Sequence, residues 1–308
     1  MTNNSALTPQ EVADILKIAK NTVYELIKRG ELNAYKVGKK IRVDLKDVEN
    51  YKNRTKKHIV NLNQNTTYEK APKNRGFIIS GQDILLDVLA RHLKNHPNGI
   101  EALRSHEGSY NGLYALYQDR VQMATAHLWD SDTGEYNIPY VRRMLPGIPA
   151  VIIRLAGRIQ GFYVRKGNPK GVHSWEDLKR QDLAIINREK GSGVRVLLDE
   201  HLRKLGILSK TIRGYEREYS SHLAVASAVA RGEADLGIGN EKASLQVKDI
   251  DFIPLQPEKY DLVIKKENLN KAPFTAALDI LRSREFKLEM EGIGGYDLTE
   301  TGNIIAET

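Results

Sequence analysis

Two hydrophobic patterns divide the chain. Before residue 54, apolar residues recur three and four positions apart, as at Val12, Ile15 and Leu16, which predicts short amphipathic helices. Beyond residue 76, short apolar runs alternate with helical patterns, and this alternation predicts an α/β fold with mainly parallel strands. The expected strands occupy residues 76–80, 121–126, 150–156, 161–165, 183–187, 236–239 and 252–255.

The N-terminal pattern contains clear helix boundaries. Thr8 is placed to cap a helix that begins at Pro9, and Glu11 completes a capping box with Thr8. A second helix is expected from about residue 21 to 29, where Gly30 ends it. Two short helices separated by such a break predict a helix-turn-helix.

A hairpin and a third helix follow these two helices. Apolar and polar residues alternate on both sides of Gly38, and Asp44 is placed to cap a helix. The segments YELIKRGEL (24–32) and VGKKIR (37–42) carry a resemblance to the winged helix-turn-helix of the MerR and excisionase families, over residues 6–54. From their positions we expect eight residues to contact bases or phosphates of double-stranded DNA: Lys20, Asn21, Thr22, Tyr24, Lys28, Lys39, Lys40 and Arg42.

The charge distribution supports a polyanionic partner for this module. Residues 1–75 hold 16 Lys and Arg against 8 Asp and Glu, whereas the rest of the chain holds 31 of each and is neutral. The whole net charge of +8 therefore lies on the N-terminal part, which favours nucleic acid. The alternatives are a solvated basic surface, or a helical hairpin that docks to protein.

The C-terminal pattern predicts two lobes joined by crossing strands, at about residues 156–166 and 255–264. The motifs GSYNGLYAL, RIQGFYVRKGNP, NREKGSGVRVLLD and SSHLAVASAVARGEADLGIG resemble the substrate-binding-like domain of bacterial regulators related to molybdate-binding proteins. The resemblance implies a two-lobed, periplasmic-binding-protein-like (type II) sensor, often for an oxyanion. The expected domains are a winged helix-turn-helix (1–54), a linker (55–75) and the sensor (76–308), with lobe 1 at 76–155 and 256–308 and lobe 2 at 156–255.

Four loops that precede helices carry small and hydroxyl residues suited to an anion. Backbone N–H groups at a helix start bind anions without a full counter-charge, although each such loop alone is also an ordinary helix cap. Their occurrence in both expected lobes favours a ligand site. The candidate ligand-binding residues are Ser80, Gly81, Gln82, Asp83, Ser109, Asn111, His127, Asn187, Arg188, Gly191, Ser192, Gly193, Arg195, Ser221 and His222.

Three charged candidates refine the expected ligand. Arg188 and Arg195 can each grip an oxyanion or a carboxylate, or can form surface ion pairs with Glu189 or Asp199. Asp83 would repel an anion, so it is expected to cap its helix, to bind an amine, or to pair with an arginine. The expected ligand is therefore a molybdate- or tungstate-like oxyanion or a small carboxylate.

Several classes of function are not favoured. The chain has no cysteine, no apolar stretch of the roughly 20 residues that span a bilayer, and no apolar signal segment. It lacks a Gly-x-Ser-x-Gly elbow, and GSGVR lacks the Lys-Ser/Thr of a phosphate-binding loop. We therefore expect no enzyme, metal site or cofactor.

These features together predict a cytoplasmic, ligand-responsive transcription regulator that acts as a homodimer, without a membrane partner. The alternatives are a molybdate- or cofactor-related binding or biosynthetic protein with the basic domain as a tether, and an excisionase-type architectural protein.

Overall fold

The computed structural model describes residues 6–38, 40–52 and 76–308, and its contacts divide the chain into two units, Met1–Glu69 and Lys70–Thr308. The predicted linker and Lys39 lie outside the described residues. The N-terminal unit contains α1 (Pro9–Leu16), α2 (Lys20–Lys28) and a helical stretch over residues 45–52. Its sheet has the order β1 (Ala6–Leu7), β3 (Lys40–Asp44), β2 (Tyr35–Val37).

The predicted capping box fixes the start of α1. The Glu11 N–H donates to Thr8 Oγ1 at 3.3 Å, and the Thr8 N–H donates to a Glu11 carboxylate oxygen at 2.7 Å. The helices and the sheet then enclose one small apolar core, formed by Val12, Ala13, Val23, Leu26, Leu32, Val43 and Val48. This packing confirms a helix-turn-helix with an attached hairpin. The short strand β1, which pairs with β3, was not predicted.

A nine-stranded sheet runs through the C-terminal unit. Its order is β5 (Ala102–Ser105), β4 (Phe77–Ser80), β6 (Met123–Ala126), β11 (Ile250–Lys265), β7 (Ala150–Arg165), β10 (Leu236–Asn240), β8 (Ile185–Arg188) and β9 (Glu218–Tyr219), with β12 (Ile304–Glu307) paired to β7.

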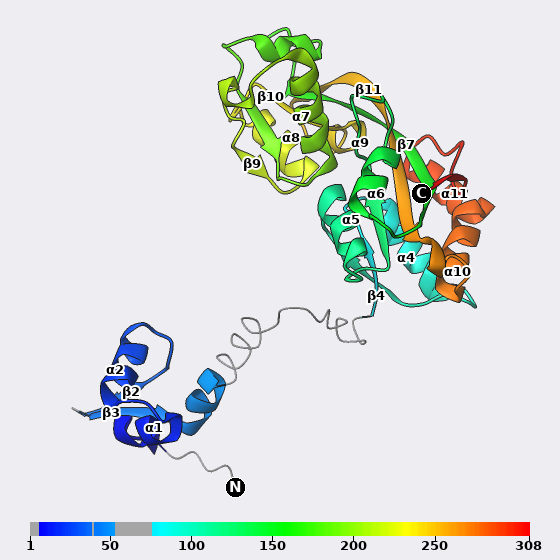
Figure 1. Cartoon of the computed structure of the whole chain (residues 1–308). Helices are drawn as coiled ribbons and strands as arrows, with labels where there is room; N and C mark the ends of the chain where they lie inside the picture. The colour runs from blue at the N-terminus through cyan, green and yellow to red at the C-terminus, as the bar shows by residue number, and fades with distance from the viewer. Residues whose placement is uncertain (1–5, 39, 53–75) are drawn as a thin grey trace. The chain divides into compact units, whose positions relative to one another are not determined.

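The long strands β7 and β11 join two lobes (Figure 1). They pair antiparallel along their whole length, from Ile250 against Arg165 to Lys265 against Ala150. The prediction of separate strands at 150–156 and 161–165 is corrected, because β7 continues through Gly157 and Gly161. Parallel pairs occur inside the lobes, whereas pairs that involve β7 or β11 are antiparallel.

Each lobe has its own helices and its own core. Lobe 1 carries α4 (Leu85–Asn95), α5 (Ser109–Tyr117), α6 (Ile138–Met144), α10 (Ala272–Arg282) and α11 (Arg284–Ile293). Lobe 2 carries α7 (Gly193–Leu205), α8 (His222–Ala230) and α9 (Glu241–Ser244). Apolar clusters cover the sheet within each lobe, and Trp129 from the segment before β7 packs into the cluster of lobe 2. In the described residues, no helix is both long and apolar enough to cross a bilayer.

Candidate functional site

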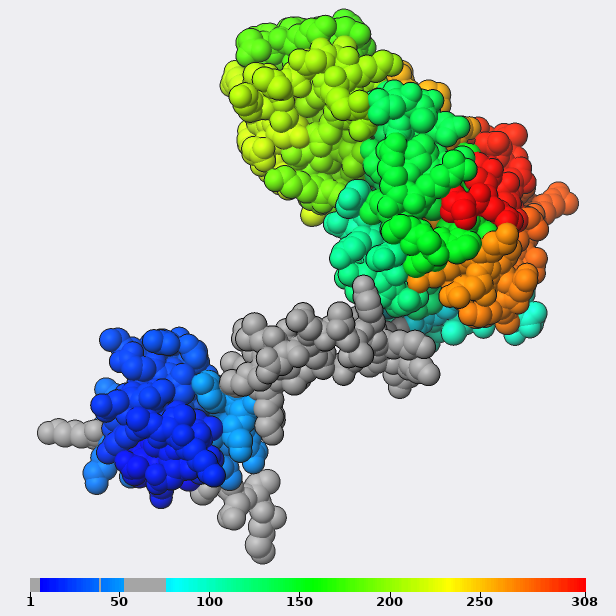
Figure 2. All heavy atoms as spheres, in the orientation of Figure 1, coloured from blue at the N-terminus to red at the C-terminus, as the bar shows by residue number. Residues whose placement is uncertain are grey.

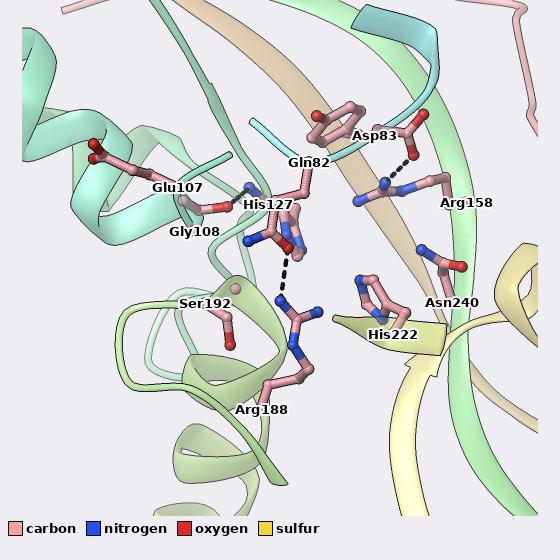
Figure 3. Close-up of a pocket in the computed structure, with 13 residues that line it drawn as sticks. Gln82, Asp83, Glu107, Gly108, His127, Arg158, Arg188, Ser192, His222 and Asn240 are labelled. Atoms are coloured by element: carbon pink, nitrogen blue, oxygen red, sulfur yellow. Dashed lines mark hydrogen bonds and ion pairs between the residues drawn. The ribbon is translucent and has the colours of Figure 1, made fainter. Parts of the chain in front are cut away.

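A small polar cavity lies between the two lobes (Figure 3). Its volume of about 50 Å³ has room for roughly three to five non-hydrogen atoms of a ligand, at 10–15 Å³ per water-sized group. Charged groups and hydrogen-bonding groups dominate its wall. The lining residues are Gln82, Asp83, Glu107, Gly108, Ser109, His127, Arg158, Arg188, Ser192, Gly193, His222, Asn240 and Tyr260.

Three helices begin at the wall of this cavity. Ser109, Gly193 and His222 are the first residues of α5, α7 and α8, and all three line it. The first N–H groups of a helix have no acceptor inside the helix, and they carry its positive partial charge. Ser192 caps α7 by accepting from the Arg195 N–H at 3.3 Å. Lobe 1 supplies one of these helix starts and lobe 2 supplies two.

Arg188 is the cationic side chain that lobe 2 places at the cavity. It is 2 % exposed, at the end of β8. Its Nε and Nη2 donate to the two carboxylate oxygens of Glu189 at 2.7 and 2.8 Å, and Nη2 also donates to Gln82 Oε1 at 2.7 Å. Nη1 has no hydrogen-bond acceptor in the part of the chain that the structure describes. Arg188 therefore keeps donor capacity next to the cavity.

Arg158 forms the centre of a buried ion-pair network on the opposite wall. Its Nη1 donates to Asp83 Oδ2 at 2.6 Å, and its Nε donates to Glu258 Oε1 at 2.7 Å. Asp83 also accepts from Tyr296 Oη and from the Leu85 N–H, which begins α4. Asp83 thus accepts from the first N–H of α4, although Ile84 holds the N-cap position, and it pairs with an arginine. Arg158 neutralises Asp83, so this carboxylate does not present an unpaired charge to the cavity.

The network sets the protonation of its members. Burial would raise the pKa of Glu258, but Arg158 and His127 outweigh it and lower the pKa to about 2. His127 Nδ1 lies 3.1 Å from Glu258 Oε2. Burial lowers the pKa of His222 well below its usual value, and the charges of Arg188 and Arg158 act in the same direction. His222 is therefore a neutral imidazole at pH 7, and its buried Nδ1 has no partner in the described residues.

The two lobes are in contact around the cavity. The Tyr110 N–H donates across the cleft to the Gly191 carbonyl at 3.0 Å, and Arg188 reaches Gln82 from lobe 2. A Cβ on Gly193 would lie 2.4 Å from the His127 ring. Figure 2 shows atoms of both lobes meeting on the face that it draws. The structure is therefore a closed form, in which glycines allow the close approach.

Eight of the fifteen predicted ligand residues line the cavity: Gln82, Asp83, Ser109, His127, Arg188, Ser192, Gly193 and His222. The other seven do not line it: Ser80, Gly81, Asn111, Asn187, Gly191, Arg195 and Ser221. Their placement corrects the prediction that they face the same space.

The most consequential of these seven is Arg195. Its guanidinium lies over the Tyr215 ring at 4.1 Å, donates to Glu218 Oε1 at 3.0 Å and lies 3.5 Å from Asp199. For Arg195, the structure therefore shows the alternative of an ion pair with Asp199, with Glu218 as a further partner. Ser221 caps α8 instead of facing the cavity, by accepting from the Ala224 N–H at 3.1 Å.

The remaining five residues lie behind the residues that line the cavity. Asn187 donates to the Tyr215 carbonyl, and Asn111 packs against Gly191 across the cleft. Ser80 lies under Gly112, and Gly81 has a φ of +150° with its missing Cβ directed at Thr125. These residues position the lining without reaching it.

Five lining residues were not predicted: Glu107, Gly108, Arg158, Asn240 and Tyr260. Arg158 and Tyr260 lie within the long strands, where periodicity does not show which side chain meets the cleft. Asn240 caps α9 by accepting from the Ala243 N–H at 3.0 Å. The Asn-x-x-Ala start of α9 was the signal that could have identified it. No group of three or more His, Asp or Glu side chains in the described residues could hold a metal ion.

Seven of the eight predicted DNA-contacting residues are described, and they lie on two elements of the N-terminal unit. Lys20, Asn21, Thr22, Tyr24 and Lys28 are exposed on α2, which buries Val23 and Leu26 on its other face. Lys40 is exposed and Arg42 is half-buried on β3. One surface of α2 is thus free to meet a partner.

Together, these features define a helix-turn-helix domain joined to a two-lobed binding domain. The chain belongs to the PBP-like family, whose model, described as a PBP superfamily domain, matches residues 90–282. A model described as a helix-turn-helix domain matches residues 6–56. The uncharacterized protein YvgK of Bacillus subtilis is 43 % identical over 317 residues, covering 100 % of both chains.

Solved structures share the fold at low sequence identity. One is a Clostridium perfringens protein described as a substrate-binding protein of a phosphate ABC transporter, with phosphate bound. Its TM-score is 0.52 at 14 % identity, covering 72 % of this chain and 98 % of that one. Another is a hydrogen-peroxide-bound OxyR variant of Corynebacterium glutamicum, with a TM-score of 0.52 at 12 % identity, covering 93 % and 89 %. At these identities the likeness concerns the fold alone.

Proposed function

We propose that the protein is a ligand-responsive, DNA-binding transcription regulator whose C-terminal unit binds a small anion between its lobes. The observation that carries the proposal is the convergence of three helix starts and the free Nη1 of Arg188 on one small cavity. Such donors are suited to an oxyanion or a carboxylate, because N–H groups and a guanidinium all supply hydrogens to negative oxygens. The proposed ligand contacts are the eight predicted residues that line the cavity.

The size of the cavity restricts the ligand class. Space for roughly three to five non-hydrogen atoms admits a tetrahedral oxyanion such as molybdate, tungstate, sulfate or phosphate, or a carboxylate as small as acetate. An anion that contacts both lobes stabilises the closed form over an open one. A ligand shifts this equilibrium only by its differential affinity for the two forms. We propose that this shift changes the affinity of a cytoplasmic homodimer for its operator.

A screen of anions tests the ligand class. We expect at least one of molybdate, tungstate, sulfate, phosphate and acetate to raise the melting temperature in proportion to the logarithm of its concentration. Arg188→Met should abolish this rise, because it removes the free donor. Arg231→Met is the matched control, because Arg231 is an exposed arginine that also pairs with a nearby glutamate, Glu233. An equal rise in both variants, or no rise with any anion, would refute the anion site.

Salt dependence tests the DNA-binding half of the proposal. In Lys28→Glu/Lys40→Glu we expect duplex binding to weaken by 10-fold or more at about 0.1 M salt, with a shallower dependence of log K on log salt. The matched control is Lys210→Glu/Lys248→Glu, which makes the same charge change at exposed positions of the C-terminal unit. The measurement is fluorescence anisotropy of a labelled duplex at several salt concentrations. Equal weakening in both double variants would assign the effect to net charge and not to the helix-turn-helix.

A further inference from the structure

A second pocket lies beside the crossing strands, separate from the ligand cavity. It has a volume of about 540 Å³, within the usual range for small-molecule sites, and it shares no lining residue with the cavity. We name it the hinge pocket. It is lined by Trp129, Gly134, Glu135, Tyr136, Ile138, Arg154, Gln256, Pro257, Lys259 and Ile305.

Arg154 is the unusual member of the hinge pocket. Only 5 % of this residue is exposed, yet none of its guanidinium nitrogens donates a hydrogen bond within the described residues. Its Nε lies 3.0 Å from Asp261 Oδ1 and 3.8 Å from Glu300, and Nε and Nη1 are fully buried without a hydrogen-bond partner. Buried arginine nitrogens are nearly always hydrogen-bonded, since an unmade bond costs on the order of 1–3 kcal/mol or more. Within the described residues, Arg154 is thus held by an ion pair through Nε, while its other guanidinium nitrogens have no hydrogen-bond acceptor.

The acidic neighbour of Arg154 reaches only one of its nitrogens, Nε. Asp261 Oδ2 accepts from Asn137 Nδ2 at 2.7 Å, and its Oδ1 has no hydrogen bond in the described residues. Burial raises the pKa of Asp261 to about 6, and Arg154 only partly offsets this effect. Asp261 is therefore ionised at pH 7 and pairs with Nε of Arg154, but it leaves Nη1 and Nη2 without a partner in the described residues. Lys259, which donates to Glu300 Oε2 at 3.3 Å, is a second cation at the same pocket.

The rest of the wall is largely apolar. Tyr136, Ile138, Pro257 and Ile305 line it together with Trp129. The indole of Trp129 stacks on His201 of α7, with ring centroids 4.6 Å apart, and is 9 % exposed. A ligand that fits this pocket therefore needs an apolar body as well as an anionic end.

We propose that the hinge pocket binds a small carboxylate with an aromatic or branched apolar body. The carboxylate accepts from Nη2 of Arg154, the one guanidinium nitrogen that is not fully buried, assisted by Lys259, and the body packs against Trp129, Tyr136 and Ile138. The proposal concerns a second ligand, different in size and chemistry from the anion of the cavity. Because Arg154 and Pro257 lie on the two crossing strands and Trp129 contacts α7, occupancy of this pocket acts on the hinge itself.

Tryptophan fluorescence and calorimetry of the full chain test the proposal. The chain has two tryptophans, and Trp175→Phe leaves Trp129 as the reporter. Phenylacetate and benzoate are the probes, and 2-phenylethanol is the uncharged counterpart of phenylacetate. We expect saturable binding of at least one carboxylate, with affinity reduced 10-fold or more in Arg154→Met. Lys259→Met, at a half-exposed position, is a second variant in case Arg154→Met does not fold, and it should also weaken binding.

The outcomes separate this site from the anion cavity. Arg188→Met should leave phenylacetate binding unchanged, and Arg154→Met should leave the anion-induced thermal shift unchanged. The inference is overturned if neither carboxylate binds up to about 10 mM, if 2-phenylethanol binds as tightly as phenylacetate, or if the folded variants at Arg154 and Lys259 retain full affinity. If the wild type showed no anion-induced thermal shift, the proposed anion site would be refuted. The proposal for the hinge pocket would not be affected.

Discussion

Replacing Gly108 by alanine is expected to reduce anion affinity by about 100-fold without destabilising the fold. In the closed form, a Cβ on Gly108 would lie 2.6 Å from the carbonyl oxygen of Gly191 and 2.8 Å from Cα of Ser192. These atoms belong to the backbone of the other lobe, so only separation of the lobes relieves the overlap. Gly108 itself has φ −69° and ψ 163°, which alanine adopts without strain.

The test for Gly108→Ala is calorimetric titration of the preferred anion, together with thermal unfolding without ligand. The unliganded melting temperature should stay the same or rise slightly, because alanine reduces the entropy of the unfolded chain. Gly292→Ala is the matched control, since its Cβ meets nothing within 4 Å and its φ is not positive. If Gly108→Ala bound the anion as the wild type does, lobe closure would not be part of binding.

Glu258→Gln is expected to destabilise the C-terminal unit by about 3 kcal/mol at pH 7, which corresponds to a melting temperature lower by about 10 °C. Glu258 is 1 % exposed and pairs with Arg158, so the amide leaves a buried guanidinium with Asp83 as its remaining counter-charge. A depression of the pKa from 4.5 to about 2 corresponds to about the same free energy.

The lowered pKa of Glu258 also predicts how the stability difference between wild type and Glu258→Gln changes with pH. Because the pKa of Glu258 is lower in the folded chain, its contribution is complete above pH 4.5 and is lost as the pH falls from 4.5 to about 2. The difference in unfolding free energy between wild type and Glu258→Gln should therefore narrow over that range, as measured by denaturant unfolding. Glu291→Gln, at an exposed position, should show no difference at any pH. A gap that stayed constant into acid would show that Glu258 is not ionised in the fold.

Local signals in the sequence predicted the N-terminal unit well. A cap, a proline and a glycine each specify backbone geometry within a few residues, so the boundaries of α1 and α2 follow from Thr8, Pro9 and Gly30. The same holds for α7, where Ser192 begins the helix and Gly206 ends it. Long-range pairing has no such local signal. The sequence indicated a crossing strand at about residues 156–166, but it did not indicate that β7 runs unbroken from Ala150 to Arg165, because that depends on pairing with β11 far along the chain.

The residues of the candidate site that could be predicted from the sequence are those at the starts of helices. Ser109, Ser192, Gly193 and His222 were found in this way, because caps are recognisable in one sequence. Arg158 was missed because its role depends on meeting Asp83 and Glu258, which lie 75 and 100 residues away. Arg195 was misplaced because a helical residue two positions after the first can point toward the loop or toward Tyr215, and only packing decides which.

The route of the chain through the two lobes has a consequence during synthesis. Lobe 1 needs β11, β12 and α10, which pair with β6 and β7 or pack against α4, so its sheet and core cannot be completed before residues 250–308 leave the ribosome. The helix-turn-helix draws its core from residues before 53. The core of lobe 2 also waits for the start of β11, because Ile250 belongs to it and Phe252 packs against it. Because domains fold in order as they emerge, a nascent chain carries a folded helix-turn-helix well before it carries a functional sensor. Chains that stall after about residue 250 would therefore combine a finished DNA-binding unit with no means of responding to ligand.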